Sequence, residues 1–355
     1  MNRYRVSYYA HHFGTGHLRH AQNVASTKMF DIQVASTGPR NPDLLPGPAE
    51  YVELNSDVGN DGAQGQLPAG DYLHYAPVGE HIKERFATLS QAWRRFDPDV
   101  VMVDVSVEVA LFARLSGYRV AFRRMPGTRT DPAHRLAYCL ADAIFGYFPS
   151  ALEDQAHLEI FGRKSHYLGV PAPGNPSPGA ERDSSPPGNG PRVVVQTSLA
   201  SSIPLRDVAR AAAASPGWSW QVVGSVDPDG TPLPRNLVLH GVLPDPAPLM
   251  RTANLVISSA GHNAVVAAAA CRRPVLLIPE KRPFAEQLAF ARALHGKAGV
   301  ALLETWSPPA PWPEVLEHAA HTDPEALAKA LFVGTTEFTR ALHAVVQSCV
   351  APVVP

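Results

Sequence analysis

Short apolar runs alternate with amphipathic stretches along most of the chain. Residues 100–103 (VVMV) form a wholly apolar run that closes on Asp104, and residues 192–196 contain a second run of this kind. Runs that are apolar throughout are typical of parallel strands covered on both faces. A stripe of large apolar residues at spacings of four and three predicts a helix with one buried face: Ile82, Phe86, Leu89, Trp93 and Phe96. The alternation predicts an α/β fold.

A stretch dense in Pro, Gly and Ser divides the chain at residues 170–191 (VPAPGNPSPGAERDSSPPGNGP). The strand and helix pattern stops there and restarts at residue 192. A chain of 355 residues is also comfortable for two domains of ordinary size. We therefore expect two doubly wound, Rossmann-like domains, residues 1–169 and 192–355, joined by a linker at 170–191.

A strand, a tight turn and a helix are predicted once in each half. In the first half, a strand over residues 3–10 runs into Gly14 and Gly16, which permit a sharp turn before a helix from His17. In the second half, the apolar residues 255–257 lead through the small residues 258–261 into an Ala-rich helix. The free N–H groups of such a helix make an anion site suited to a diphosphate.

The next predicted strand, residues 275–278, ends in a polar cluster that includes Glu280, and a helix carrying Glu286 and Gln287 follows. Ligands of open parallel sheets lie outside the carboxyl ends of the strands, so both loops are expected to share one crevice. The alternative is that residues 258–261 are a plain turn of some other doubly wound protein.

This block resembles the donor half of inverting GT-B glycosyltransferases, the group of the lipid II N-acetylglucosaminyltransferase and the small-molecule glycosyltransferases. The resemblance implies two Rossmann-like domains facing across a cleft, with terminal helices packing back on the first. In those families a Gly opens a helix under the diphosphate and an acidic-Gln pair contacts the sugar. The donor residues it implies here are Thr197, Ser198, Gly241, Val242, Ser259, Gly261, His262, Asn263, Glu280, Glu286 and Gln287.

Two positions depart from the family pattern. Ser259 stands where the small-molecule enzymes often place a phosphate-binding His, and Ala267 stands where many relatives place a Glu that grips the ribose. Glu280 is one candidate replacement for that Glu. Thr197 and Ser198 are equally compatible with an ordinary capping turn.

The first half resembles the acceptor side of the same fold, where a Gly-His pair often opens the first helix. The residues this implies for the acceptor are His11, His12, Gly14, Thr15 and Gly16. His17 is the favoured general base, because it follows the glycine turn and an imidazole titrates near working pH. Asp104 ends a strand on the same side of the sheet and is expected to orient His17, with His11 and His12 as rival bases and a helix cap as the alternative role of His17.

The composition of the chain narrows the classes of ligand and the cellular setting that we expect for the protein. With 31 basic and 32 acidic residues the formal charge is −1, which argues against nucleic acid as the main ligand. The basic loop at residues 123–135 is expected to form a solvated rim more readily than an acceptor site. Cys139, Cys271 and Cys349 are expected to be buried, reduced thiols. No secretory pattern, membrane-spanning run or metal-ligand spacing is evident, so a cytoplasmic, metal-independent protein is expected.

The resemblance to GT-B glycosyltransferases implies an inverting hexosyltransferase of secondary metabolism that moves a sugar from a nucleoside diphosphate, UDP favoured, to a small-molecule acceptor. No separate cofactor is expected. Two alternatives remain: a sugar-nucleotide epimerase or hydrolase of the same fold, and a catalytically silent relative that binds sugar nucleotide, which the absent Glu at Ala267 suggests.

Overall fold

The computed structural model describes residues 3–12, 16–45, 47, 49–57, 72–173, 190–197, 201, 203–227, 229–306 and 311–351. Three residues expected in the site, Gly14, Thr15 and Ser198, lie outside the described residues. Most of the expected linker lies outside them as well.

The N-terminal half contains a parallel sheet of seven strands. Its order is β3-β2-β1-β4-β5-β6-β7. The strands are β1 (Arg5–Tyr9), β2 (Asp31–Thr37), β3 (Glu50–Leu54), β4 (Val100–Val103), β5 (Val120–Arg124), β6 (Ala143–Gly146) and β7 (Ser165–Tyr167). Because β1 pairs with both β2 and β4, the strand order reverses at β1 and leaves a crevice at the carboxyl ends of β1 and β4.

Helices cover both faces of this sheet. Helices α2, α3 and α4 pack on one face, where the stripe residues Leu89 and Trp93 are fully buried. Helix α1 packs on the other face together with α12 from the end of the chain. The helices of this half are α1 (Gly16–Ser26), α2 (Glu80–Phe96), α3 (Val107–Leu115), α4 (Pro132–Leu140) and α5 (Gln155–Phe161), with short 3₁₀ turns η1 (Ser150–Leu152) and η2 (Gly162–Lys164).

The C-terminal half repeats the architecture with six parallel strands in the order β11-β10-β9-β12-β13-β14. The strands are β9 (Arg192–Gln196), β10 (Ser219–Val223), β11 (Leu237–Leu239), β12 (Leu255–Ser258), β13 (Val275–Leu277) and β14 (Ala301–Leu302). The order reverses at β9, so a second crevice lies at the ends of β9 and β12. Two doubly wound domains, as expected from the sequence, are therefore confirmed.

The helices of this half also form two layers. Helices α7, α8, α9 and α11 share a core on one face of the sheet, and α6 and α10 share one on the other. Their bounds are α6 (Leu205–Ala214), α7 (Ala247–Arg251), α8 (His262–Ala270), η3 (Pro283–Ala285), α9 (Glu286–Ala298), α10 (Trp312–Ala320), α11 (Pro324–Leu331) and α12 (Thr335–Val350).

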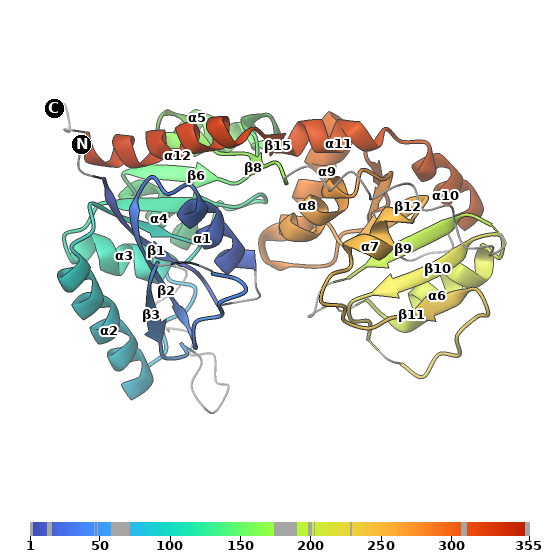
Figure 1. The fold of residues 1–355 in the computed structure, drawn as a ribbon, viewed down its shortest axis with the longest axis horizontal. Helices are drawn as coiled ribbons and strands as arrows, with labels where there is room; N and C mark the ends of the chain where they lie inside the picture. Colours follow the sequence, from blue (N-terminus) through green and yellow to red (C-terminus); the bar gives the residue numbers. More distant parts are fainter. Residues whose placement is uncertain are drawn as a thin grey trace.

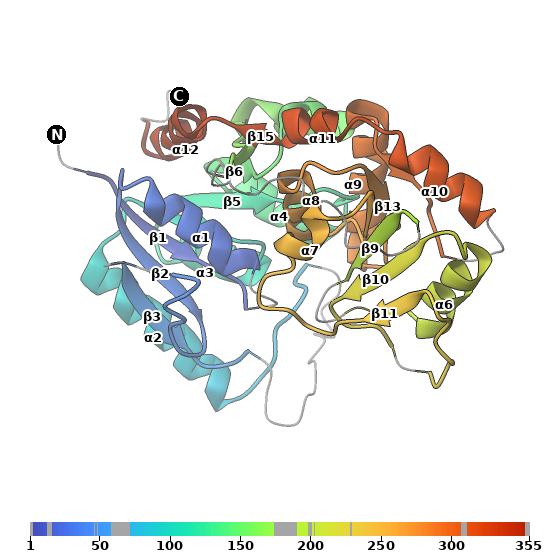
Figure 2. The ribbon, with the colours of Figure 1, turned by 45° about the vertical axis from the view of Figure 1, so that its right-hand side comes forward.

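The end of the chain returns to the first domain. Figure 1 shows the two sheets side by side, with α12 lying along the N-terminal one, and Figure 2 shows α12 seen nearly end-on above β1. Phe338 and Leu342 of α12 are buried in the core that contains Val6 and Tyr8. Between the sheets, β8 (Val170–Pro171) pairs in parallel with β15 (Phe332–Val333), so the first residues of the expected linker form a strand. No helix among the described residues has the length and hydropathy needed to cross a bilayer.

Two expectations are wrong. The basic loop is not a solvated rim, because Arg123, Arg124 and Arg129 are buried and only Arg135 of the four is exposed. The Arg124 Nη2 atom lies 2.9 Å from Glu153 Oε1. The negative charge of Glu153 compensates the buried positive charge of Arg124. Cys139 is exposed, whereas Cys271 and Cys349 are buried, and all three thiols are free.

Candidate active site

His17 and Asp104 meet at the crevice of the N-terminal domain. Asp104 follows β4 directly and is fully buried, and His17 is the second residue of α1. The His17 Nδ1 atom lies 2.9 Å from Asp104 Oδ2. An ionised carboxylate only accepts, so Nδ1 carries a proton, and in the neutral imidazole Nε2 then keeps a lone pair that can take one.

Arg123 at the end of β5 holds the other oxygen of Asp104, with 2.7 Å between Nη1 and Oδ1. Burial opposes the charge of Asp104, yet the adjacent Arg123 and His17 hold the pKa of its carboxyl well below its usual range. The Arg123 Nη1 atom also lies 3.3 Å from His17 Nδ1. Since both nitrogens are donors to the ionised Asp104, we interpret this as two neighbouring donors, each bonded to a different oxygen of one carboxylate.

The buried side chains of Tyr8 and Tyr147 also lie near the Asp104 carboxylate. The Tyr8 hydroxyl lies 3.2 Å from Asp104 Oδ2 and 3.2 Å from the Tyr147 hydroxyl. Burial and the charge of Asp104 raise the pKa of Tyr8 well above its ordinary value. Both phenols therefore stay neutral, and Tyr8 can donate to Asp104. The Arg123 guanidinium lies over the Tyr147 ring at 5.1 Å.

Two more histidines link this network to the C-terminal domain. His20 of α1 stacks on Tyr147 with 4.1 Å between ring centroids, and its Nε2 faces Arg123 Nη2 at 3.1 Å. His262 of α8 lies 2.7 Å from the Tyr147 carbonyl through Nε2. Burial and the charge of Arg123 lower the pKa of His262 to about 4, and the same two causes lower that of His20 well below its ordinary value. Both rings are neutral, so His20 accepts from Arg123 and His262 donates to the carbonyl.

The amino ends of α1 and α8 meet across the domain boundary. A Cβ atom added to Gly16 would lie 2.0 Å from Asn263 Nδ2, so a larger residue would displace the Asn263 side chain from this close approach. The helix that carries His17 and the helix expected to bind a diphosphate thus begin at adjacent points, which no spacing in the sequence reveals.

Gly261 caps α8 in an extended conformation, with φ −65°, and the left-handed residue of the turn is Ala260, with φ 62°. A Cβ atom on Gly261 would meet only Gln287 Nε2, at 3.5 Å. The described residues therefore leave space in front of Gly261, and Gln287 lies beside the amino end of α8. Gln287 also accepts a hydrogen bond of 2.8 Å from the Glu280 backbone N–H.

Glu286 faces the N-terminal domain. Its Oε2 lies 2.8 Å from Arg129 Nη2, and Arg129 Nη1 lies 3.0 Å from His134 Nε2. Phe284 and Ala285, immediately before Glu286, have φ of 60° and 50°, a left-handed conformation that costs free energy in residues with a Cβ. The Thr128 backbone N–H donates to the Phe284 carbonyl at 3.0 Å. The loop after β5 thus supports the strained turn that presents Glu286.

A cavity of about 440 Å³ lies between the two domains, beside α1 and α8. Arg19 of α1 and Asn263 and Ala267 of α8 line it. Arg19 is exposed and makes no ion pair or hydrogen bond with any other described residue. The cavity therefore offers an available cation opposite the amino end of α8, and it includes the position of the absent ribose-gripping Glu.

Other expected donor residues lie apart from this cavity or have structural partners. Thr197 donates to the Ser225 carbonyl at 2.6 Å. Gly241 has a left-handed φ of 66° in the loop after β11, and Val242 beside it is exposed. Ser259 is buried in the turn before α8. Glu280 is buried, with its Oε2 atom 3.7 Å from Arg282 Nη2.

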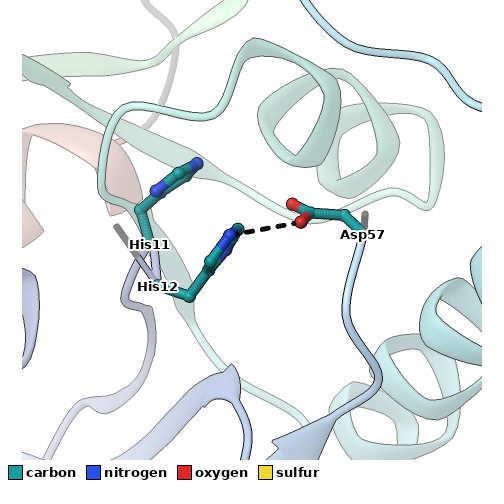
Figure 3. Close-up of side chains that lie close together, drawn as sticks. All are labelled: His11, His12 and Asp57. Atoms are coloured by element: carbon teal, nitrogen blue, oxygen red, sulfur yellow. Dashed lines mark ion pairs between the residues drawn. The ribbon is translucent and has the colours of Figure 1, made fainter. Parts of the chain in front are cut away.

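His11 and His12 stack on each other just after β1, with 4.7 Å between ring centroids, and Asp57 faces them from beyond β3 (Figure 3). His11 also meets the His17 ring edge-on at 5.5 Å. His74, Asp131 and His134 form a second group of imidazoles and a carboxylate. These two groups are the candidate metal-binding clusters among the described residues.

Several solved structures are similar to this chain over nearly its whole length. The spinosyn forosaminyltransferase SpnP has a TM-score of 0.68 at 14% identity, with 97% of this chain and 100% of that chain covered. The calicheamicin glycosyltransferase CalG4 has a TM-score of 0.60 at 17% identity and covers 100% of both chains. A putative UDP-N-acetylglucosamine 2-epimerase from Listeria monocytogenes has a TM-score of 0.66 at 15% identity, covering 98% and 97%.

The chain has the GT-B fold. The resemblance inferred from the β12–α8 block is therefore confirmed at the level of the fold. No protein-family profile and no curated protein sequence matches the chain. Transferases and an epimerase share this fold, so the activity has to be argued from the site.

Proposed function

We propose that the protein is an inverting glycosyltransferase that moves a sugar from a nucleoside diphosphate sugar to a small-molecule acceptor. The observation that carries the proposal is the meeting of the two helix ends. It sets the His17–Asp104 pair next to the amino end of α8, where Gly16 touches Asn263. A base and a diphosphate site at adjacent points are what a single displacement at an anomeric carbon requires.

In the proposed reaction, His17 Nε2 takes the proton of an acceptor hydroxyl while Asp104 holds the Nδ1 proton. The hydroxyl oxygen attacks the anomeric carbon, and the bond from that carbon to the diphosphate oxygen breaks. The proton ends on the imidazole, and the negative charge ends on the nucleoside diphosphate. The N–H groups of α8 and the cation of Arg19 stabilise that charge.

Glu286 and Gln287 are proposed to contact the sugar, Gln287 from beside Gly261 and Glu286 in the orientation set by Arg129. We favour UDP as the carrier, since the name of the Listeria neighbour contains a UDP-sugar. The names of the spinosyn and calicheamicin enzymes support a small-molecule acceptor of secondary metabolism. Glu280 is proposed to bind the ribose in place of the Glu that is absent at Ala267.

One incubation separates the candidate functions. The protein is mixed with UDP-sugars, with and without a panel of small hydroxylated acceptors, and the products are resolved by chromatography and mass. Transfer that depends on an acceptor supports the proposal. Isomerisation or hydrolysis without acceptor assigns an epimerase or hydrolase instead. Binding without turnover identifies a silent relative. It is detected as a raised melting temperature, because a ligand at a hundred times its Kd raises the free energy of unfolding by about 2.7 kcal/mol.

A further inference from the structure

Three potential metal ligands gather beside the proposed base. His11 and His12 follow β1 and Asp57 follows β3, and one side-chain nitrogen or oxygen from each lies within 4.8 Å of the other two. Figure 3 shows the Asp57 carboxylate turned toward the two stacked rings. All three side chains are partly buried at the carboxyl edge of the N-terminal sheet.

The spacing of these atoms suits a shared ion better than a hydrogen bond. His12 Nε2 lies 3.4 Å from Asp57 Oδ1, longer than a normal hydrogen bond from nitrogen to oxygen. Two ligands of a tetrahedral zinc ion, each about 2.0–2.2 Å from it, lie about 3.3 Å apart. The Asp57 Oδ1 atom is buried and accepts no hydrogen bond from the described part of the chain.

The other oxygen of Asp57 is engaged by a cation. Arg85 Nη2 lies 3.8 Å from Asp57 Oδ2, and Arg85 is held in place by the Tyr9 hydroxyl at 2.7 Å and by Thr37 at 2.8 Å. The positive charge of Arg85 opposes a second cation nearby and lowers its affinity. It also fixes the carboxylate, which leaves Oδ1 turned toward His12.

We propose that His11, His12 and Asp57 form a binding site for a divalent transition-metal ion, with Zn²⁺ as the ion whose ligand spacing matches the distance between His12 and Asp57. Imidazole nitrogens and one carboxylate are ligands that Zn²⁺ takes. Three protein ligands leave a fourth position open for an oxygen of water or of a bound hydroxyl compound. The His11 and His17 rings are 5.5 Å apart, so an oxygen held there is close to the proposed base.

The second cluster lacks this spacing. Asp131 meets His74 at 2.9 Å and His134 at 2.7 Å, both of normal hydrogen-bond length, and the remaining His134 nitrogen meets Arg129 at 3.0 Å. Its polar atoms satisfy one another. It therefore serves as a matched control of the same composition, in the same domain.

The test measures metal binding without nucleotide or acceptor, so it does not depend on the proposed transferase activity. Untagged protein is stripped with a chelator, dialysed and titrated with Co²⁺, whose visible absorption reports tetrahedral coordination, and then with Zn²⁺ in competition. The wild type is expected to bind one Co²⁺ per chain, displaced by Zn²⁺. Asp57→Asn and His11→Ala should each weaken binding by at least about 100-fold, since loss of a supporting contact alone costs 10- to 100-fold.

Asp131→Asn, which keeps the capping oxygen of α4, should leave Co²⁺ binding unchanged. Circular dichroism of each variant checks that the fold is retained. His11→Ala keeps the test decisive if Asp57→Asn unfolds through loss of the Arg85 contact. Absence of Co²⁺ binding in the wild type, or binding lost in Asp131→Asn and kept in both other variants, overturns the proposal.

Discussion

The two domains place the same unit, a strand, a turn and a helix, at their switch points and surround it differently. Around α1, the residues behind His17 are charged and buried, with Asp104 and Arg123 each less than 4% exposed. Around α8, the helix is rich in alanine, and Gly261 at its start has open space in front. The difference suits the roles that we propose, in which the first unit orients a base and the second accommodates a ligand.

Buried charges explain the first behaviour. An ion pair in the interior is costly unless its members are fully hydrogen-bonded, and then its geometry is tightly determined. Asp104 has His17, Arg123 and Tyr8 around it, so the imidazole has one orientation. Helix α8, His262–Ala270, contains no Asp, Glu, Lys or Arg of its own. Its first N–H groups have no partner within the helix, and a diphosphate would satisfy them.

The largest effect is expected from removing the proposed base. His17→Ala should lower turnover by a factor of about 10² to 10⁴, the usual contribution of a general base. Affinity for UDP should stay nearly unchanged, because the groups proposed to bind the diphosphate, the amino end of α8 and Arg19, are not altered. Asp104→Asn should lose less turnover, since it misorients the base and does not remove it. Steady-state kinetics and calorimetry check the two parameters, and full transfer activity in His17→Ala would move the base to His11 or His12.

A smaller effect is expected from the contact between Arg129 and Glu286, which joins the two domains. Arg129→Lys cannot hold both His134 and Glu286, so kcat/KM for the donor sugar should fall about 10- to 100-fold, as for one charged hydrogen bond. Affinity for UDP, which carries no sugar, should not change if Arg129 acts by positioning Glu286. The exposed Arg135→Lys is the control. Equal losses for UDP and UDP-sugar would contradict a positioning role.

A substitution of Arg19 tests whether the nucleotide binds in the cavity between the domains. Arg19→Met should weaken UDP binding about tenfold, or about 1.4 kcal/mol, and should reduce the dependence of binding on salt. Uridine, which lacks the phosphates, should bind the variant and the wild type alike. Exposed Arg94→Met on α2 gives the matched control. If UDP affinity in Arg19→Met equals that of the wild type, the diphosphate lies elsewhere.

The smallest expected effect concerns stability against pH. Burial and Arg123 lower the pKa of His262 to about 4 from 6.5. Between these values the unfolded chain binds a proton that the native chain does not, so stability is full above about pH 6.5 and falls as the pH drops toward 4. His262→Gln should flatten this loss, as measured by denaturant unfolding at several pH values. An unchanged slope would show that the pKa of His262 is the same in the native and the unfolded chain, which would contradict this account.

Sequence patterns located the helix starts and strand ends but not the polar side chains that face inward. The strand-end argument placed Asp104 near His17, and the structure brings them to 2.9 Å. Arg123 was expected in a solvated rim because basic loop residues form one more often than they bind an anion, but its partner Asp104 lies 19 residues away in the sequence. A single sequence carries no signal for that pairing.

Other misses had a readable signal. Arg85 lies three residues after Ile82 and four before Leu89, on the apolar face of α2, where a charge predicts a buried partner. Asp131 followed by Pro132 is a capping pair that marks the start of α4 inside the expected basic loop. The contact of Gly16 with Asn263 depends on how the domains dock, which local patterns do not determine.

Calorimetric titration of UDP into Gly261→Val tests the division of labour between the domains most directly. The backbone φ of −65° accepts valine, and a Cβ atom there meets only Gln287 at 3.5 Å, so the fold should persist with an unchanged unfolding midpoint. The added side chain would occupy the space in front of α8. The account predicts that the wild type binds one UDP per chain and that the variant binds none. Unchanged UDP affinity in a folded Gly261→Val would contradict it.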